Sequence, residues 1–337
     1  MNLTEKKYKK FSLIKEMMET AHIVENLDIE KILSLKKEVE NRRIFITGEG
    51  SSRIFPAKKV MYEARKKDYK QDFYTDCATQ ALEYQLLDST VFVASNSGKT
   101  KEVLELIRKL KKENHRNIIS IIANTETPVM NEAHISYLLS CGAEKAVAAT
   151  KSVIEQSLFY DLLFRSLNQV NLPDLRKMGR LITQVLEMSI NKEIVDILAH
   201  SKYIYFTGRN NGVAEELTLK ANEIARKKSD FLEGTYVFHG IEEVMDTEEV
   251  VVIVDPFEDE EEVYKKILID GIGLKVIAIS TRKTIFPTII IPAYNDFTNY
   301  IEIVAGWNLL VEVGLNLGVN LDKTVRARKI GHEFKES

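Results

Sequence analysis

Short apolar runs alternate with longer amphipathic stretches along most of the chain. The clearest runs are residues 43–48, 91–95 and 118–123 in the first half and 203–208, 250–254 and 275–280 in the second. Continuously apolar runs of this length are typical of strands buried on both faces, and the stretches between them are long enough for helices. The pattern predicts α/β architecture with parallel sheets, in which ligands bind at the carboxyl ends of the strands.

The second half of the chain resembles the first. Runs ending in Thr-Gly at Gly48 and Gly208 are each followed by a helical pattern that ends in Ala-Arg-Lys-Lys, beginning at Ala64 and Ala225. The likeness therefore extends through a whole strand–helix unit. We expect a duplicated fold of two tandem doubly wound parallel-sheet domains of the flavodoxin-like kind.

Two long helical stretches, 151–167 and 175–199, lie between the halves, and the polar and Pro-containing residues 168–174 separate them. The predicted organisation is an N-terminal helical segment (1–30), a first domain (31–170), a second domain (175–318) and a C-terminal tail (319–337). The N-terminal segment has apolar positions at helical spacing, namely Phe11, Ile14, Met17, Met18 and Ala21.

Composition narrows the choice of partner. The 337 residues include 47 Lys and Arg against 50 Asp and Glu, a net charge of −3, so bulk charge favours neither nucleic acid nor a membrane surface. Cys77 and Cys141 form no metal-binding or disulfide pattern, which suits a reducing cytoplasm, and no apolar run is long enough to span a bilayer. We expect a small-molecule ligand and no metal or organic cofactor.

Two hydroxyl-rich turns follow predicted strands. Residues 95–100, Ser-Asn-Ser-Gly-Lys-Thr, lead into an amphipathic helix, and residues 48–52, Gly-Glu-Gly-Ser-Ser, do the same in the preceding unit. Backbone amides at a helix N-terminus bind phosphate, and Lys99 adds charge; a simple N-cap is the structural alternative for Ser95. Neighbouring parallel strands bring both turns to one anion. Neither turn is a GxGxxG or GxxxxGK[ST] nucleotide motif.

These segments resemble the SIS (sugar isomerase) domain family. Residues 95–100 are similar to its S-x-S-G-x-T motif, residues 50–52 to its G-[ST]-S turn, and residues 144–151 to the E-x-x-V-A-S-T-K segment in the isomerase half of glucosamine-6-phosphate synthase, with Ala149 in place of Ser. The resemblance implies phosphate binding by Ser52, Ser95, Asn96, Ser97 and Thr100. It also implies that the sugar is lined by Gly50, Ser51, Val147, Ala148 and Lys151.

A charged helix face in the second half carries candidate catalytic groups. Glu216, Lys220 and Glu223 are spaced to share one face, which by itself fits a surface row of ion pairs. The segment 216–223 resembles the E-x-x-L-K-x-x-E of the synthase isomerase domain, and His239 stands where the family has the His of its H-G-P motif. The resemblance implies that Glu223 is the base between C1 and C2, that His239 opens the ring, that Lys220 positions base and chain, and that Glu216 supports them.

The tail and the histidine loop depart from the family pattern. The family places a lysine after D-x-P-R in its tail, and the spacing from Asp322 selects Lys329, although Lys323, Arg326 or Arg328 can take that role. Next to His239, the family's Pro is replaced by Ile241.

The resemblance implies an isomerase or deaminase that acts on a hexose or amino-sugar 6-phosphate by proton transfer between C1 and C2, working as a cytoplasmic homodimer. Two alternatives remain open: a fructosamine-6-phosphate deglycase, and a non-catalytic phosphosugar sensor. The pairing of Glu223 with His239 and the lack of a recognisable DNA-binding segment favour an enzyme.

Overall fold

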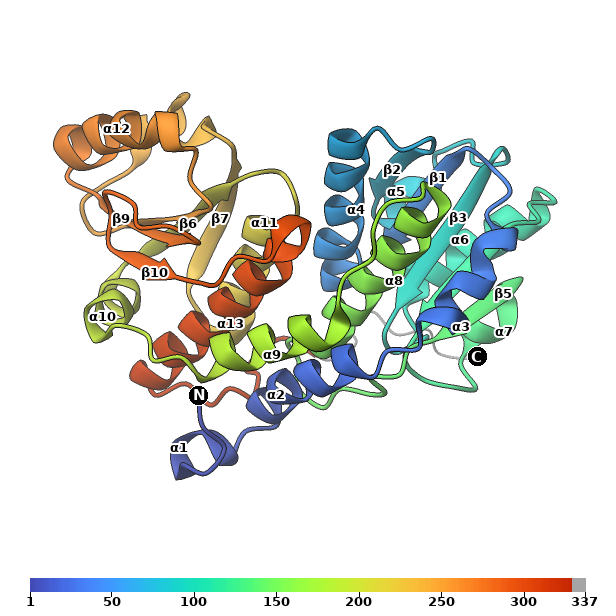
Figure 1. Cartoon of the computed structure of the whole chain (residues 1–337), viewed down its shortest axis with the longest axis horizontal. Helices are drawn as coiled ribbons and strands as arrows, with labels where there is room; N and C mark the ends of the chain where they lie inside the picture. The colour runs from blue at the N-terminus through green and yellow to red at the C-terminus, as the bar shows by residue number, and fades with distance from the viewer. Residues whose placement is uncertain (329–337) are drawn as a thin grey trace. The chain divides into compact units, whose positions relative to one another are not determined.

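The computed structural model describes residues 1–328 and divides into two compact units. One comprises His22–Lys177 with the described residues after Val325, and the other comprises Met1–Ala21 and Met178–Val325. Each unit contains a five-stranded, fully parallel sheet flanked by helices (Figure 1). The predicted α/β class with two doubly wound sheets is confirmed, and we call the parts the β1–β5 unit and the β6–β10 unit.

The sheet of the β1–β5 unit has the strand order β2-β1-β3-β4-β5. Its strands are β1 (Arg43–Gly48), β2 (Asp72–Asp76), β3 (Ser89–Ser95), β4 (Ile118–Ile122) and β5 (Ile135–Leu138). Its helices are α3 (Ile29–Leu33), α4 (Ile54–Lys67), α5 (Ala78–Ala81), α6 (Lys101–Lys112), α7 (Pro128–Glu132) and α8 (Lys151–Leu167), with 3₁₀ turns η1 (Ser34–Glu38) and η2 (Gly50–Ser52).

The sheet of the β6–β10 unit has the equivalent order, β7-β6-β8-β9-β10. Its strands are β6 (Tyr203–Gly208), β7 (Lys228–Glu233), β8 (Val250–Val254), β9 (Lys275–Ser280) and β10 (Thr288–Ile290). Its helices are α1 (Lys6–Lys9), α10 (Lys192–His200), α11 (Val213–Lys220), α12 (Glu261–Tyr264) and α13 (Thr298–Asn316), with π-helical segments η3 (Ala221–Ala225) and η7 (Lys265–Ile272) and 3₁₀ turns η4 (Tyr236–Phe238), η5 (Ile241–Val244), η6 (Glu258–Glu260) and η8 (Asn295–Phe297). Two further helices, α2 (Ser12–Glu25) and α9 (Leu175–Glu187), run across the divisions between the units.

Helices cover both faces of each sheet, which explains why the central strands are apolar throughout. In the β1–β5 unit, α6 buries its apolar stripe against residues such as Phe45 and Val91, while Phe92 points to the opposite face and packs edge-on against Phe164 of α8. In the β6–β10 unit, α12 and η7 cover one face through Tyr264 and Leu268. The other face carries α11 and α13 (Figure 1).

One predicted helix is in fact two. The stretch 175–199 was expected to be continuous, but α9 ends at Glu187 and α10 begins at Lys192. The cause is local, because the side chain of Asn191 accepts a hydrogen bond from the Glu193 N–H at 2.8 Å and starts a new helix. The expected apolar face of the N-terminal helix is present in α2, where Ile14, Met17 and Ala21 are buried.

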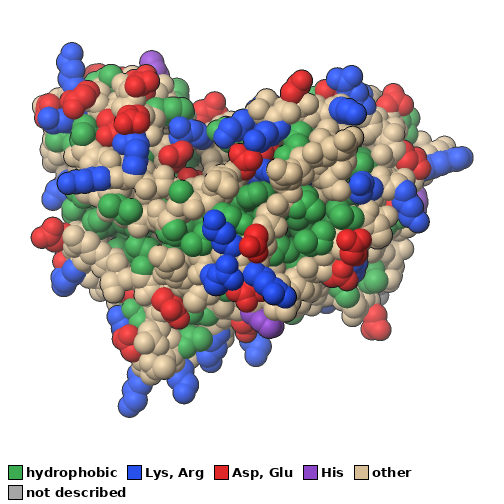
Figure 2. Space-filling model, in the orientation of Figure 1, with side chains coloured by type: hydrophobic (Ala, Val, Ile, Leu, Met, Phe, Trp, Pro, Cys, Tyr) green, Lys and Arg blue, Asp and Glu red, His purple; other side chains and the backbone are tan. Residues whose placement is uncertain are grey.

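Charged side chains of both signs lie on the surface, in keeping with the 47 basic and 50 acidic residues of the sequence. On the face drawn in Figure 2, Lys and Arg side chains are mixed with Asp and Glu side chains rather than gathered by sign. Within residues 1–328, no helix is both long enough and apolar enough to cross a bilayer.

Candidate active site

A ring of hydroxyl groups lies between the end of β3 and the start of α6. The Ser95 hydroxyl is 2.9 Å from that of Thr100 and 3.5 Å from that of Ser97, and it accepts a hydrogen bond from the Gly98 N–H at 3.0 Å. Ser97 in turn accepts from the Lys99 N–H at 3.2 Å. The three hydroxyls thus stand together at the N-terminus of a twelve-residue helix, an arrangement that suits an anion. We call this group the hydroxyl cradle.

Gly98 allows the cradle to close tightly. Its φ is +66°, and a Cβ at this position would lie 2.2 Å from the Thr127 hydroxyl oxygen. Thr127 is itself fixed as the cap of α7, where its hydroxyl accepts from the Met130 N–H at 3.3 Å. A side chain at position 98 therefore meets both backbone strain and a fixed neighbour.

The turn after β1 lies next to the cradle, as predicted. β1 and β3 are paired with Gly48 opposite Ala94, and a Cβ on Gly48 would come within 2.8 Å of the Ala94 carbonyl oxygen. Of the two serines that follow, Ser51 is buried and Ser52 is half-buried. Gly50 has φ +54°, which turns the chain into η2. The geometry thus presents a second hydroxyl-rich turn at the same edge of the sheet.

Glu49, which sequence reasoning passed over, sits in this turn. One of its carboxylate oxygens accepts a hydrogen bond from the Ala78 N–H at 3.0 Å. Burial raises the pKa of Glu49, and the nearby Glu102 adds to the rise, while the Ala78 N–H and Arg53 partly offset it. Its place inside the G-E-G-S-S segment was the available signal, since a carboxylate at the carboxyl edge of a parallel sheet is a functional position.

Glu144 ties the predicted sugar-lining loop to the cradle. Its carboxylate accepts hydrogen bonds from the Thr150 N–H at 2.8 Å, from the Ser152 hydroxyl at 2.7 Å and from the Asn96 side-chain amide at 3.3 Å. The loop it organises contains Val147, which is half-buried, and Ala148, which is buried; Lys151, also buried, is the first residue of α8. The structure therefore brings Asn96 and this loop together.

The three charged residues predicted to share a helix face do so in the β6–β10 unit. The Lys220 ammonium lies 3.0 Å from Glu216 and 2.8 Å from Glu223. Lys220 and Glu216 are fully buried, whereas the Glu223 side chain remains 21% exposed. Burial alone would lower the pKa of Lys220, but the two carboxylates outweigh it and the pKa is raised. Lys220 is therefore a positive charge held against a carboxylate that solvent can reach.

Glu223 lies in a π-helical turn rather than in the α-helix that the spacing predicted. The turn, η3, is followed by Arg226 in the left-handed region at φ +56°. The Asn222 side-chain amide donates to the Lys227 carbonyl and to the Ser229 hydroxyl, both at 2.8 Å, which holds the turn against the start of β7. Short π segments recur at functional sites, and here one sets the position of the proposed base.

Among the described residues, no hydrogen bond or ring contact joins His239 to Glu223. Glu223 precedes β7 and His239 follows it, so the two lie toward opposite ends of a six-residue strand, a separation of roughly 17 Å or more. His239 is exposed, and its ring packs against Phe238 with centroids 5.3 Å apart.

The C-terminal tail is described only in part. Lys329, predicted to reach the substrate carbonyl, lies outside the described residues. The alternatives Lys323, Arg326 and Arg328 are all exposed. Asp322, from which the spacing was counted, is bound to the N-terminus of α2 through its carboxylate.

A second charged group, unpredicted, stands at the carboxyl edge of the other sheet. The Arg209 guanidinium, just after β6, lies 2.5 Å from the Asp255 carboxylate, just after β8, and over the Phe257 ring at 4.3 Å. Nearby on α13, burial raises the pKa of Glu302 to about 7; Asp255 adds to this rise, while Asn299 and Arg209 oppose it. This edge thus carries charged groups where the first sheet carries hydroxyls.

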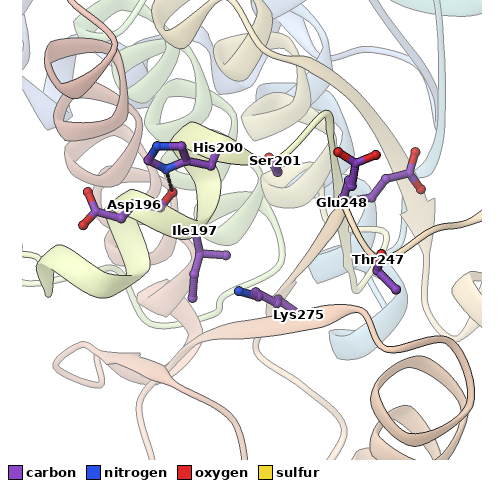
Figure 3. A pocket seen from close by; sticks show the side chains of 8 residues that line it. Asp196, Ile197, His200, Ser201, Thr247, Glu248 and Lys275 are labelled. Atoms are coloured by element: carbon purple, nitrogen blue, oxygen red, sulfur yellow. Dashed lines mark hydrogen bonds between the residues drawn. The ribbon is translucent and has the colours of Figure 1, made fainter.

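The pocket drawn in Figure 3, of about 350 Å³, lies at the opposite edge of the same sheet. His200 and Ser201 precede β6, Thr247 precedes β8 and Lys275 begins β9, so these side chains surround the amino ends of the strands. None of the candidate site residues lines this pocket, and we therefore do not place the active site here. In the described part of the chain, no group of His, Cys, Asp and Glu side chains is arranged to hold a metal ion.

Comparison with known proteins finds a matching domain family and several relatives. Residues 39–166 match the family model described as "SIS domain". Glutamine–fructose-6-phosphate aminotransferase (isomerizing) of Methanocaldococcus jannaschii is 28% identical over 340 residues, covering 92% of this chain and 30% of that protein, and the Sulfolobus acidocaldarius protein of the same name is 30% identical over 142 residues, covering 41% of this chain and 24% of its own length. The chain thus spans about a third or less of the length of these curated relatives.

Solved structures share the fold over nearly the whole chain. The C-terminal domain of glucosamine-fructose-6-phosphate aminotransferase from Francisella tularensis has a TM-score of 0.77 at 21% identity and covers 95% of this chain and 100% of its own. Tagatose-6-phosphate ketose/aldose isomerase from Escherichia coli has a TM-score of 0.79 at 18% identity, covering 98% and 99%. At these identities the likeness establishes the fold alone.

Proposed function

Because residues 39–166 of this chain match the SIS domain family, we propose that it is a phosphosugar isomerase or deaminase acting on a hexose or amino-sugar 6-phosphate. The reaction moves a proton between C1 and C2 of the open-chain sugar. The names of its relatives support this proposal: several are isomerizing aminotransferases, and one structural neighbour is a glucosamine-6-phosphate deaminase from Thermotoga maritima.

The hydroxyl cradle supports a phosphate-binding role. Ser95, Ser97 and Thr100 supply hydroxyls at the N-terminus of α6, and Ser52 adds another from the turn after β1. A phosphate dianion accepts hydrogen bonds from such donors and is favoured by the helix dipole. In this proposal the cradle holds the 6-phosphate, Asn96 links it to the loop of Val147, Ala148 and Lys151, and that loop faces the sugar.

Glu223 is the proposed base. Its carboxylate is partly exposed and accepts a hydrogen bond from the Lys220 ammonium at 2.8 Å. A carboxylate fixed in this way can take a proton from C1 of a ketose or C2 of an aldose and return it to the neighbouring carbon, while the carbonyl and hydroxyl oxygens exchange a proton. Lys220 orients the base, and buried Glu216 balances the charge of Lys220. The proposal rests mainly on this contact between the buried Lys220 ammonium and the Glu223 carboxylate, which solvent can reach.

His239 is the proposed ring-opening group, and we place it in a partner's site. Its imidazole is exposed and lies beyond the other end of β7 from Glu223. Exposed apolar side chains border it, with Tyr236 54% and Val244 71% accessible. A homodimer in which this loop reaches the neighbouring subunit gives the histidine a substrate and covers the apolar side chains.

Solvent deuterium tests the proposal. The protein is incubated in deuterated water with fructose-6-phosphate, glucosamine-6-phosphate or a fructosamine-6-phosphate, and the sugars are followed by NMR. We expect the wild type to introduce deuterium at C1 or C2 of one of them and Glu223→Gln to introduce none. Glu193→Gln is the matched control, because Glu193 is an exposed residue of α10 in the same unit.

The consumed compound identifies the reaction. Loss of amine from glucosamine-6-phosphate indicates a deaminase, and loss of the amino-acid substituent from a fructosamine-6-phosphate indicates a deglycase. If the wild type labels no sugar while one of them still raises its melting temperature, the chain is a phosphosugar sensor and the roles given to Glu223 and His239 are wrong.

A further inference from the structure

The root of the C-terminal tail, residues 319–323, is fastened to the β6–β10 unit at three points besides the Val319 N–H, which donates to the Gly314 carbonyl at 2.8 Å where the chain leaves α13. At the first, the Asp322 carboxylate accepts hydrogen bonds from the Ser12 N–H at 2.7 Å and the Leu13 N–H at 3.0 Å. These are the first two amides of α2, which have no partner within the helix. A carboxylate at this end of a fourteen-residue helix is favoured by both hydrogen bonds and the helix dipole.

The second point joins the tail to the turn that carries the proposed base. The Arg226 guanidinium donates to the Asn320 carbonyl at 3.3 Å and to the Lys323 carbonyl at 3.1 Å. Arg226 follows directly after η3 and is three residues from Glu223. Its left-handed backbone directs the side chain away from the run of the helix, so one residue ends the π-helical turn and also binds the tail.

The third point is apolar. Leu321 is 3% exposed and lies against α13, where a Cβ on Gly314 would come within 2.9 Å of the leucine side chain. The same Cβ would lie 3.1 Å from the carbonyl oxygen of Ile224, a residue of η3. The missing side chain at Gly314 therefore lets the tail root and the π-helical turn lie together on α13.

Apart from these three points the tail root is loosely packed. A hollow of about 510 Å³ is lined by Lys10 and Phe11 on one side and by tail residues such as Val319 and Lys323 on the other. Lys323 itself is exposed. Because little continuous packing surrounds this segment, its position depends on a small number of contacts.

We propose that Asp322 and Arg226 are positioning residues that latch the tail root beside the turn of Glu223, so that the basic side chains of Arg326 and Arg328 are held within reach of the reacting sugar. A chain extends at most about 3.5 Å per residue, so the place where Lys323 is anchored decides how far residues 326–328 can travel. When the tail is not latched, the basic group is still present but is no longer held in position for the reaction. The catalytic part of this inference rests on the proposed function.

Hydrogen–deuterium exchange followed by mass spectrometry tests the latch without any assay of activity. In Asp322→Ala and in Arg226→Ala, peptides covering residues 315–328 are expected to exchange about tenfold faster than in the wild type. Asp28→Ala is the matched control, since Asp28 caps α3 through the Lys31 N–H at 3.0 Å and does not contact the tail. Asp322→Asn keeps one acceptor oxygen but turns an amide NH₂ group toward the other N–H donor, so its exchange is expected to fall between the wild type and Asp322→Ala. This graded result guards against general misfolding.

The second measurement asks whether the latch serves the reaction. Asp322→Ala is expected to lower kcat about tenfold with KM for the sugar phosphate unchanged, while Asp28→Ala leaves both constants as in the wild type. Unchanged exchange in the tail peptides of Asp322→Ala overturns the latch. Faster exchange with unchanged kcat overturns its role in positioning. If the wild type has no activity, the proposed function fails, and the exchange experiment still decides whether the latch exists.

Discussion

Each unit has a buried lysine on the helix that follows its first strand, and the two are used differently. Lys59 on α4 is fully buried and lies 2.5 Å from Asp161 of α8 and 3.8 Å from Glu63. Arg165 of α8 completes the group at 2.6 Å from Glu63. All four side chains are at most 2% exposed, so no charge in this group can meet a solute.

Lys220 on α11 is as buried as Lys59, but its two acidic partners differ in exposure. One of its carboxylates, Glu216, is as buried as those around Lys59, while the other, Glu223, is partly exposed. Both lysines need acidic partners because an unpaired buried ammonium is costly. Under the proposed function, a fully buried group of ion pairs contributes to stability alone, whereas a group with one partly exposed carboxylate can also act on a substrate.

The largest effect is expected from Glu223→Gln. It removes the partly exposed carboxylate and keeps its shape, so we expect deuterium exchange to fall about a thousandfold, the usual scale for a lost general base. The free energy of unfolding, measured by urea denaturation, is expected to fall by only about 1 kcal/mol, because Glu216 still neutralises Lys220 and the glutamine oxygen can still accept its hydrogen bond. A large loss of stability with the exchange rate intact would falsify the contrast between the two groups.

Glu63→Gln is the reciprocal change in the sealed group. It leaves Arg165 and Lys59 with less negative charge in a place water does not reach. We expect the unfolding free energy to drop by about 3 kcal/mol, while deuterium exchange per folded molecule stays as in the wild type. If Glu63→Gln instead abolishes exchange and preserves the urea midpoint, the sealed group takes part in catalysis and the division made here is wrong.

The last helices of the two units give a second matched pair. Glu155 of α8 accepts three hydrogen bonds at 2.6–2.8 Å from Ser140 and Cys141, whereas Glu302 of α13 accepts one, from Asn299 at 3.0 Å. Burial raises the pKa of Glu302 from 4.5 to about 7. Since a raised pKa means that the folded state holds the proton more tightly, the contribution of Glu302 to stability is greatest below pH 4.5 and falls as pH rises through 7, by at most about 3 kcal/mol.

Glu302→Gln is therefore expected to flatten the dependence of the melting temperature on pH between 5 and 8 and to stabilise the protein at pH 8. Glu155→Gln is expected to destabilise it, because an amide NH₂ group would face donors from the backbone. Equal pH slopes for the wild type and Glu302→Gln would show that Glu302 is ionised at neutral pH.

The smallest effect is expected at the strand ends. Ser97→Ala removes one hydroxyl of the cradle, and we expect KM for the sugar phosphate to rise about tenfold with little change in kcat, since a hydrogen bond to a charged group is worth about 1.5 kcal/mol or more. Phe257→Ala, two residues beyond Asp255 as Ser97 is two beyond Ser95, is expected to leave KM unchanged. If Phe257→Ala raises KM and Ser97→Ala does not, the phosphate binds at the β6–β10 sheet and not at the hydroxyl cradle.

Local patterns were sufficient to predict the fold. Apolar strands and glycine turns recur in order, and the six predicted runs correspond to the central strands β1, β3, β4, β6, β8 and β9. The edge strands β2, β5, β7 and β10 are less apolar and were not predicted. The hydroxyl cradle and the Glu216–Lys220–Glu223 row were also visible, because each lies within eight residues of sequence. Contacts of short range are encoded in spacing, which a single sequence displays.

Features that depend on distant residues were missed. The Lys59 group joins α4 to α8 across about a hundred residues, and the pairing of Arg209 with Asp255 depends on β6 lying beside β8. Asn191 was missed for another reason, since a polar residue that starts a new helix looks like any surface residue within a helical pattern. The π-helical form of η3 depends on its bracing by Lys227 and Ser229, which spacing does not show.

The π-helical turn at Ala221–Ala225 also limits how the chain can vary in length. A π-turn spaces its hydrogen bonds by five residues rather than four, so it fits one more residue into a turn than an α-helix does. Deleting one residue here would restore α-helical spacing and change the separation between Lys220, Glu223 and Arg226, which this turn sets. Insertions and deletions are therefore tolerated better in the loops of this unit than in this one turn.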